Sequence, residues 1–211
     1  MGEPTIRYDE LSWPEMREAI ARQPVVLLPF GTIEDHGPHL PINTDNVIVE
    51  ALCLEAARRA PDDMLVMPVV PYGLDEHHMD FPGTVSVDMQ TLLAYVSDVA
   101  ISAARHGFTH LLVVNGHGSN APLADLVARR VVLETGIVCG AMSPNAAIDP
   151  TLAEPTLSQM RNSGPGGVAH AGEYETALML HLRPDLVHME RAVREMPSEL
   201  LAAAGTHARA R

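Results

Sequence analysis

The chain has 211 residues, of which 46% are hydrophobic and 19% are charged, and its formal net charge is -13 at pH 7. This composition is that of an ordinary globular domain with a sizeable core, and it excludes an intrinsically disordered chain. The negative charge argues against binding to nucleic acid, because few cationic side chains are present to neutralise phosphates. No uninterrupted apolar run approaches the roughly 20 residues that a membrane helix requires, so we expect no membrane partner.

Two cysteines, Cys53 and Cys139, lie far apart in apolar segments. We interpret them as buried thiols in a reducing compartment rather than as a disulfide framework. The first four residues, Met-Gly-Glu-Pro, lack the basic and apolar pattern of a signal peptide. A cytoplasmic location is therefore expected.

Helical and strand patterns alternate along the chain. Helical periodicity predicts helices over residues 11–23, 44–59, 88–106, 122–134 and 173–183. Short apolar runs predict strands over residues 25–30, 65–70, 111–114 and 137–142. Ser12 and Asp88 are the expected N-caps of the first and third helices. The segment 143–168, rich in Pro, Gly, Ser and Asn, is expected to be irregular, and the tail to residue 211 is helical in composition.

Strands that alternate with helices through short connections predict a single α/β domain over residues 1–211, with a mainly parallel sheet covered on both faces. In such sheets, ligands bind beyond the carboxyl ends of the strands. Three polar clusters follow predicted strands, and they contain Glu34, His36 and Asp45, then His77 and His78, then His117. We therefore expect a functional site where these three loops meet.

The first of these loops has the chemistry of a metal site. Glu34 and His36 are two residues apart, so on an extended chain both side chains project to the same side. Carboxylate oxygens combined with imidazole nitrogens suit a divalent transition metal such as zinc or manganese. The alternative interpretation is a polar loop with incidental histidines.

Asp45 and His117 extend this set, and each has a structural alternative. Asp45 begins a predicted helix, where a capping carboxylate alone would explain an aspartate. Its functional interpretation is a bridge between two cations, one on each oxygen. His117 lies between two glycines after an apolar strand, where its imidazole is accessible. Its alternative is a turn histidine that bonds to the backbone.

The remaining candidates lie near the later part of the chain and in the second loop. Glu173 and Glu175 begin the last predicted helix. One of them could be structural, through its favourable interaction with the helix dipole, and the other could complete a metal site. His170 is a candidate base or substrate donor, with a core histidine as the alternative. His77 and His78 are adjacent, so on an extended chain at most one of them would face the site.

Four ordered segments resemble the motifs of the creatininase family of metal-dependent amidohydrolases, and the similarity runs from about residue 5 to about residue 190. These segments are Gly-Thr-Ile-Glu-Asp-His-Gly-Pro-His-Leu-Pro at 31–41 with Thr-Asp at 44–45, Phe-Pro-Gly-Thr at 81–84, Asn-Gly-His-Gly-Ser-Asn at 115–120 and His-Ala-Gly-Glu-Tyr-Glu-Thr at 170–176. The resemblance implies a three-layer α/β/α sandwich and a two-metal centre at the strand ends. It also implies zinc or manganese, sometimes iron, and commonly a homo-oligomer, a hexamer.

The resemblance places the metal ligands on Glu34, His36, Asp45 and His117, with Asp45 as the bridging group. In the creatinine-hydrolysing members a glutamate two positions after the histidine completes the site, and Ser119 stands there in this chain.

Members with the glycine-rich form of that loop use the glutamate at the start of the later helix, which corresponds to Glu173. The choice between Glu173 and Glu175 stays open. The C-terminal tail is short for the family.

The expected activity is hydrolysis of an amide or cyclic amide C–N bond in a creatinine-like, formamide or related small substrate, by a bridging water that two metal ions activate. His170 is predicted to protonate the leaving nitrogen, with Glu175 as its partner. The predicted substrate-binding residues are His78, Ser119, Asn120 and Tyr174. The alternatives are a non-catalytic or degenerate metal-binding member of the fold, and a peptide-trimming peptidase of the family.

Overall fold

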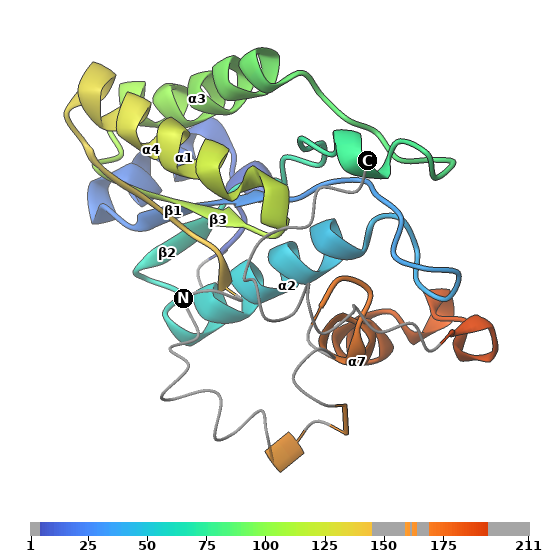
Figure 1. Cartoon of the computed structure of the whole chain (residues 1–211). Coiled ribbons are helices and arrows are strands. Elements are labelled where there is room, and N and C mark those ends of the chain that lie inside the picture. Colours follow the sequence, from blue (N-terminus) through green and yellow to red (C-terminus); the bar gives the residue numbers. More distant parts are fainter. Residues whose placement is uncertain (1–4, 145–158, 161, 164–168, 194–211) are drawn as a thin grey trace.

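A computed structural model describes residues 5–144, 159–160, 162–163 and 169–193 of the chain (Figure 1). Most of the segment 143–168, for which the sequence predicts an irregular path, lies outside these ranges. The tail beyond residue 193, for which it predicts helical composition, also lies outside them. The single-domain interpretation of residues 1–211 therefore stays a prediction.

Four parallel strands form the described sheet, in the order β2-β1-β3-β4. Their bounds are Val25–Phe30 for β1, Met64–Val66 for β2, His110–Asn115 for β3 and Val138–Met142 for β4. Val25 pairs with both Met64 and His110, so β1 lies inside the sheet. The predicted parallel arrangement is confirmed.

The second strand is shorter than its apolar sequence predicts. It ends at Val66, because Pro68 has no amide hydrogen with which to continue the ladder. The chain returns to β1 at Val70, whose amide donates to the Pro29 carbonyl (2.9 Å) and whose carbonyl accepts from the Gly31 amide (3.0 Å). This return brings the loop that starts at residue 71 to the carboxyl end of β1.

Helices cover both faces of the sheet (Figure 1). One face carries α1 (Trp13–Arg22), α3 (Met89–Arg105) and α4 (Ala121–Thr135), and the other carries α2 (Thr44–Arg59), with α7 (Glu173–Leu182) packed on α2. Leu28 lies in the core with the first group, and its neighbour Leu27 lies in the core with α2. The three-layer α/β/α arrangement is therefore confirmed.

The expected caps are present. The amide of Ser12 donates to the Glu15 carboxylate (2.8 Å) in a capping box, and the Asp88 carboxylate accepts from the amides of Gln90 and Thr91, both at 3.0 Å. Short 3-10 helices complete the described structure at Tyr8–Glu10 (η1), Glu76–His78 (η2), Gly118–Asn120 (η3), Pro184–Leu186 (η5) and Met189–Arg191 (η6). None of the helices in the described ranges has the length and apolar character to cross a membrane.

The buried amide of Asn120 holds the loops at the carboxyl ends of the strands together. Its Nδ2 donates to the carbonyl of Gly31 after β1 (3.0 Å), and its Oδ1 accepts from the amide of Leu74 in the loop after β2 (2.9 Å). This close approach requires Gly73, because a Cβ there would lie 2.8 Å from the Asn120 amide. One side chain on η3 therefore fixes the spacing of two other loops.

Candidate metal centre

Four side chains from three elements meet at this edge of the sheet. Glu34 and His36 come from the loop after β1, Asp45 from the first turn of α2, and His117 from the turn after β3. All four are buried, with exposed fractions of 1%, 1%, 3% and 5%. The structure thus brings together the residues that the strand-end rule singled out in the sequence.

Asp45 lies between the two imidazoles. Its Oδ1 is 3.2 Å from Nε2 of His36, and its Oδ2 is 3.2 Å from Nδ1 of His117. The Oδ2 atom is buried and makes no hydrogen bond with the described residues. Each oxygen of this carboxylate therefore faces a different imidazole.

Glu34 lies against the same two histidines. Its Oε1 is 2.9 Å from Nδ1 of His117 and 3.8 Å from Nε2 of His36, and its Oε2 is 2.5 Å from Nδ1 of His78. The other ring nitrogen of His36 lies 3.3 Å from the Glu34 carbonyl oxygen. That contact turns Nε2 of His36 toward the carboxylates, which is the orientation of a metal-ligating histidine.

The electrostatics of this cluster are compatible with a bound cation. Burial raises the pKa of Glu34 to about 8, whereas the adjacent imidazoles of His117 and His36 overcome burial and hold the pKa of Asp45 well below its ordinary value. Burial alone would lower the pKa of the histidines, but the carboxylates raise it to about 9 for His36 and about 10 for His117. Protons on the imidazoles thus provide the positive charge that a metal ion would otherwise supply.

The donor set also fits a divalent ion in its geometry. Ligand atoms of Glu34, His36 and Asp45 lie within 4.8 Å of one another, and further groups that share Glu34 or His36 include His117, His170 and Glu175. The free Oδ2 of Asp45 is an acceptor that a cation would satisfy. Mixed oxygen and nitrogen donors of this kind suit zinc, manganese or iron.

The two glutamates of α7 point in different directions. Oε2 of Glu175 is 3.7 Å from Nε2 of His36 and accepts from the Ala171 amide (2.6 Å). The Glu173 carboxylate instead accepts from the amides of Asn162 and Ser163, both at 2.7 Å. Residues two apart on a helix lie on different faces, so only one of them can reach the cluster. The structure brings Glu175 to the centre and does not bring Glu173 there.

His170 lies at the opening of the centre, with 38% of its side chain exposed. Its Nδ1 is 3.7 Å from Oε1 of Glu34, and its ring centroid is 4.5 Å from that of His36 and 4.6 Å from that of His78. Burial, followed by the neighbouring imidazoles, lowers the pKa of His170 to about 3. This imidazole is therefore neutral near pH 7 in the metal-free protein.

Both histidines of the second loop face the centre, although the sequence predicted at most one. The prediction assumed an extended chain, whereas Glu76–His78 forms the 3-10 helix η2, which places the two rings 4.2 Å apart on one side. His78 contacts Glu34, and His77 approaches Asp75 (3.3 Å).

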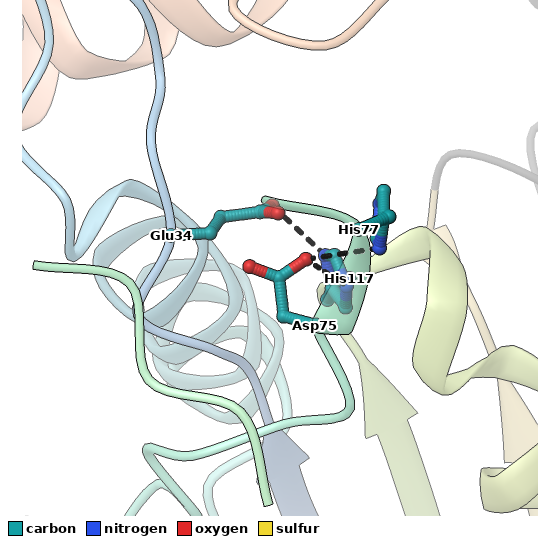
Figure 2. A group of neighbouring side chains, drawn as sticks. All are labelled: Glu34, Asp75, His77 and His117. Atoms are coloured by element: carbon teal, nitrogen blue, oxygen red, sulfur yellow. Dashed lines mark ion pairs between the residues drawn. The ribbon is translucent and has the colours of Figure 1, made fainter. Parts of the chain in front are cut away.

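Asp75 is the residue that sequence reasoning missed. Its side chain is 0% exposed, and one ring nitrogen of His117 approaches its carboxylate while the other approaches that of Glu34 (Figure 2). The available signal was its position three residues before His78 in a loop that follows a strand. That signal indicates a polar loop residue and gives no sign of its burial.

The predicted substrate-binding residues other than His78 occupy three different settings. Both polar atoms of the Asn120 amide bond to loop backbone, which favours a role in holding the loops. Ser119 is half-buried on η3, and Tyr174 is half-buried on α7 beside Glu175, with a pKa that burial raises. Their roles toward substrate stay predictions.

Comparison with known proteins identifies the family of the chain. A model of the family described as "Creatininase: Creatinine amidohydrolase" matches residues 9–211. The chain is 35% identical over 201 residues to the creatinine amidohydrolase of Pseudomonas putida, covering 90% of this chain and 76% of that protein. It is 33% identical over 187 residues to the mycofactocin precursor peptide peptidase of Mycolicibacterium smegmatis, covering 84% of this chain and 65% of the relative.

Solved structures show the same likeness. A crystal structure of creatinine amidohydrolase superposes with a TM-score of 0.83 at 31% identity, covering 92% of this chain and 78% of the other. Other matching structures are described as a manganese form and as a Zn–Zn form of creatininase. The family match spans nearly the whole chain, and we conclude that the chain belongs to the creatininase family.

Proposed function

We propose that the protein is an amidohydrolase that works with two divalent metal ions per chain. The observation that carries this proposal is the position of Asp45, which presents one oxygen to His36 and the other to His117 at 3.2 Å each. A carboxylate in that position is suited to bridge two cations. Zinc and manganese are the first candidates, because matching creatininase structures are described as Zn–Zn and manganese forms, and iron is the third.

The ligands divide into two groups around Asp45. Glu34 and His117 would hold one ion with Asp45, and His36 and Glu175 would hold the other with Asp45. We assign Glu175 rather than Glu173, because its carboxylate faces His36 at 3.7 Å. Two bound ions would supply a water of lowered pKa and would polarise the carbonyl of the substrate.

His170 is the proposed carrier of the proton that the leaving nitrogen requires. An imidazole can accept a proton at one ring nitrogen and later donate it to the leaving group. Its partly exposed ring, close to Glu34, His36 and His78, lies where substrate would enter. Glu175, predicted as its partner, is here assigned to the metal ion beside His36.

The proposed substrate is a small amide or cyclic amide. Hydrolysis of a peptide is the second candidate, because the mycofactocin precursor peptide peptidases are 31% to 33% identical to this chain. Ser119 stands where creatinine-hydrolysing members have a glutamate, and this difference favours the second candidate over creatinine itself. A cytoplasmic location and a hexameric assembly are further proposals from the resemblance.

The test is metal content per chain on protein purified without chelator, together with release of amine or formate from a panel of small amides and one short peptide. We expect two metal ions and turnover of one substrate class. Asp45→Ala should lose metal and activity together. Full metal content and normal activity in Asp45→Ala would contradict the bridging role. Metal binding without any turnover would favour the degenerate alternative.

A further inference from the structure

Asp75 is a buried carboxylate that the proposed metal ions do not use. Its side chain is 0% exposed, and neither oxygen accepts a hydrogen bond from the described residues. A buried carboxylate without a donor or a positive charge nearby is strongly unfavourable. The role of Asp75 must therefore be sought in the side chains that surround its carboxylate.

Three imidazoles surround one of its oxygens. Oδ1 lies 3.2 Å from Nδ1 of His78, 3.3 Å from Nδ1 of His77 and 3.6 Å from Nε2 of His117. The nitrogen of His78 is also 2.5 Å from Glu34, so it has a nearer acceptor. Nε2 of His117 is buried and makes no hydrogen bond with the described residues. Figure 2 marks ion pairs from Asp75 to both His77 and His117. Of these two histidines, His117 also lies against Glu34 and Asp45.

The backbone holds Asp75 in this position. Its amide donates to the Ser86 hydroxyl (3.0 Å), and the amide of the preceding residue, Leu74, donates to the Asn120 side chain (2.9 Å). Asn120 follows His117 by three residues and belongs to the same turn. The carboxylate and the imidazole are therefore anchored to a common frame.

We infer that Asp75 is the positioning residue of His117: its carboxylate, 3.6 Å from Nε2, favours the proton on that nitrogen and leaves Nδ1 facing the metal centre. With an ion bound, Nδ1 would carry the lone pair; this atom lies 2.9 Å from Glu34 and 3.2 Å from Asp45. A histidine that binds a metal through one nitrogen commonly donates the other N–H to a carboxylate or a carbonyl. His36 has the carbonyl form of this arrangement, since its Nδ1 lies 3.3 Å from the Glu34 carbonyl. The inference rests on the proposed function, because it assigns His117 to metal binding.

Asp75→Asn tests this role, because it preserves the shape of the side chain and removes its charge. Cobalt(II) is the probe, titrated into metal-free protein, since its visible absorption spectrum reports the geometry of its ligands. We expect cobalt to bind about 10–100-fold more weakly, with a changed spectrum. Asp80→Asn makes the same chemical change at an exposed position of the same loop, and should keep the affinity and spectrum of the unchanged chain.

Thermal unfolding in chelator separates lost positioning from lost folding. Asp75→Asn should still unfold cooperatively, at a Tm no higher than that of the unchanged metal-free chain, because it removes a carboxylate that faces the protonated His117. Asp75→Ser is a second variant, smaller and still able to accept a hydrogen bond, and it should shift cobalt affinity in the same direction. Unaltered cobalt affinity and spectrum in both variants would overturn the inference.

Two other outcomes have distinct meanings. If the unchanged chain binds three cobalt ions, and Asp75→Asn and His77→Gln each lose the same one, then Asp75 is a ligand and the positioning role is wrong. If the unchanged chain binds no cobalt, the proposed function fails, and the role of Asp75 fails with it. Normal binding by the unchanged chain with unaltered Asp75 variants would overturn only the role of Asp75.

Discussion

At the scale of single residues, Glu173 and Glu175 provide a matched pair. Glu175→Gln should weaken metal binding by about tenfold or more, because it removes a charged oxygen that faces His36 at 3.7 Å. Glu173→Gln should keep normal affinity, because its carboxylate bonds to Asn162 and Ser163. Metal content after dialysis at a fixed free concentration measures both. A loss confined to Glu173→Gln would reverse the ligand assignment.

The sequence predicts only those residues of the centre that a local pattern, such as a strand end or a helix start, identifies. Glu34, His36, Asp45 and His117 each follow a strand or begin a helix, so the strand-end rule is sufficient to bring them together. The burial of Asp75 depends on its contacts with Ser86 and His117 and on the bond from Leu74 to Asn120, which join residues at least 11 positions apart. No local pattern records such contacts. The direction of Glu175 likewise depends on the packing of α7 against α2.

At the scale of elements, the N-cap of α3 gives a prediction that depends on pH. The Asp88 carboxylate accepts from the amides of Thr91 and Gln90, and these bonds lower its pKa below the ordinary value. Asp88→Ala should lower Tm by a few degrees near neutral pH. Because the folded-state pKa is the lower one, this stabilisation is complete above the unfolded-state pKa of about 3.9 and disappears as pH falls through the folded-state value.

Thermal scans from about pH 7 to about pH 2 measure this difference. The gap in Tm between Asp88→Ala and the unchanged chain should narrow below about pH 4. Asp88→Asn is the control, because asparagine caps helices about as well as aspartate and carries no charge. A gap that stays constant in acid would contradict the role of the carboxylate charge.

Elements whose ends carry their own signals were predicted closely. β1 is Val25–Phe30 as expected, because its apolar run is bounded by proline and glycine, and α2 is Thr44–Arg59 as expected. β2 was overestimated, because the apolar run continues past Pro68 although the ladder does not. The helix η2 was missed, because three residues are too few for a periodic pattern.

At the scale of the whole molecule, metal binding should stabilise the fold, and more so at higher pH. With the pKa of His36 at about 9 and that of His117 at about 10, both imidazoles are protonated near pH 7 in the metal-free chain. Their charge stabilises that chain fully below the unfolded-state pKa of about 6.5, and this contribution is lost as pH rises through 9 and 10. A metal ion must displace these protons, so its affinity should rise with pH.

Zinc or manganese at about 100 times Kd should add about 2.7 kcal/mol of stability, which corresponds to roughly 5–10 °C in Tm. The shift should be larger at about pH 8 than at about pH 6 for the same metal concentration. Scanning calorimetry with metal or chelator measures it, and titration calorimetry in two buffers counts the protons released. An equal Tm shift at both pH values, with no proton release, would contradict the displacement of protons by the metal ion.

Asp45 and Glu175 stand in the first turns of α2 and α7, at the ends of those helices that carry a partial positive charge of about half a unit. The peptide groups behind each carboxylate thus offset part of its charge before any ion arrives. The proposed ligands therefore lie close together in the folded chain before any ion binds. One preparation can then be stripped and refilled with each metal in turn, so that differences in rate among the metals reflect the ions and not the scaffold.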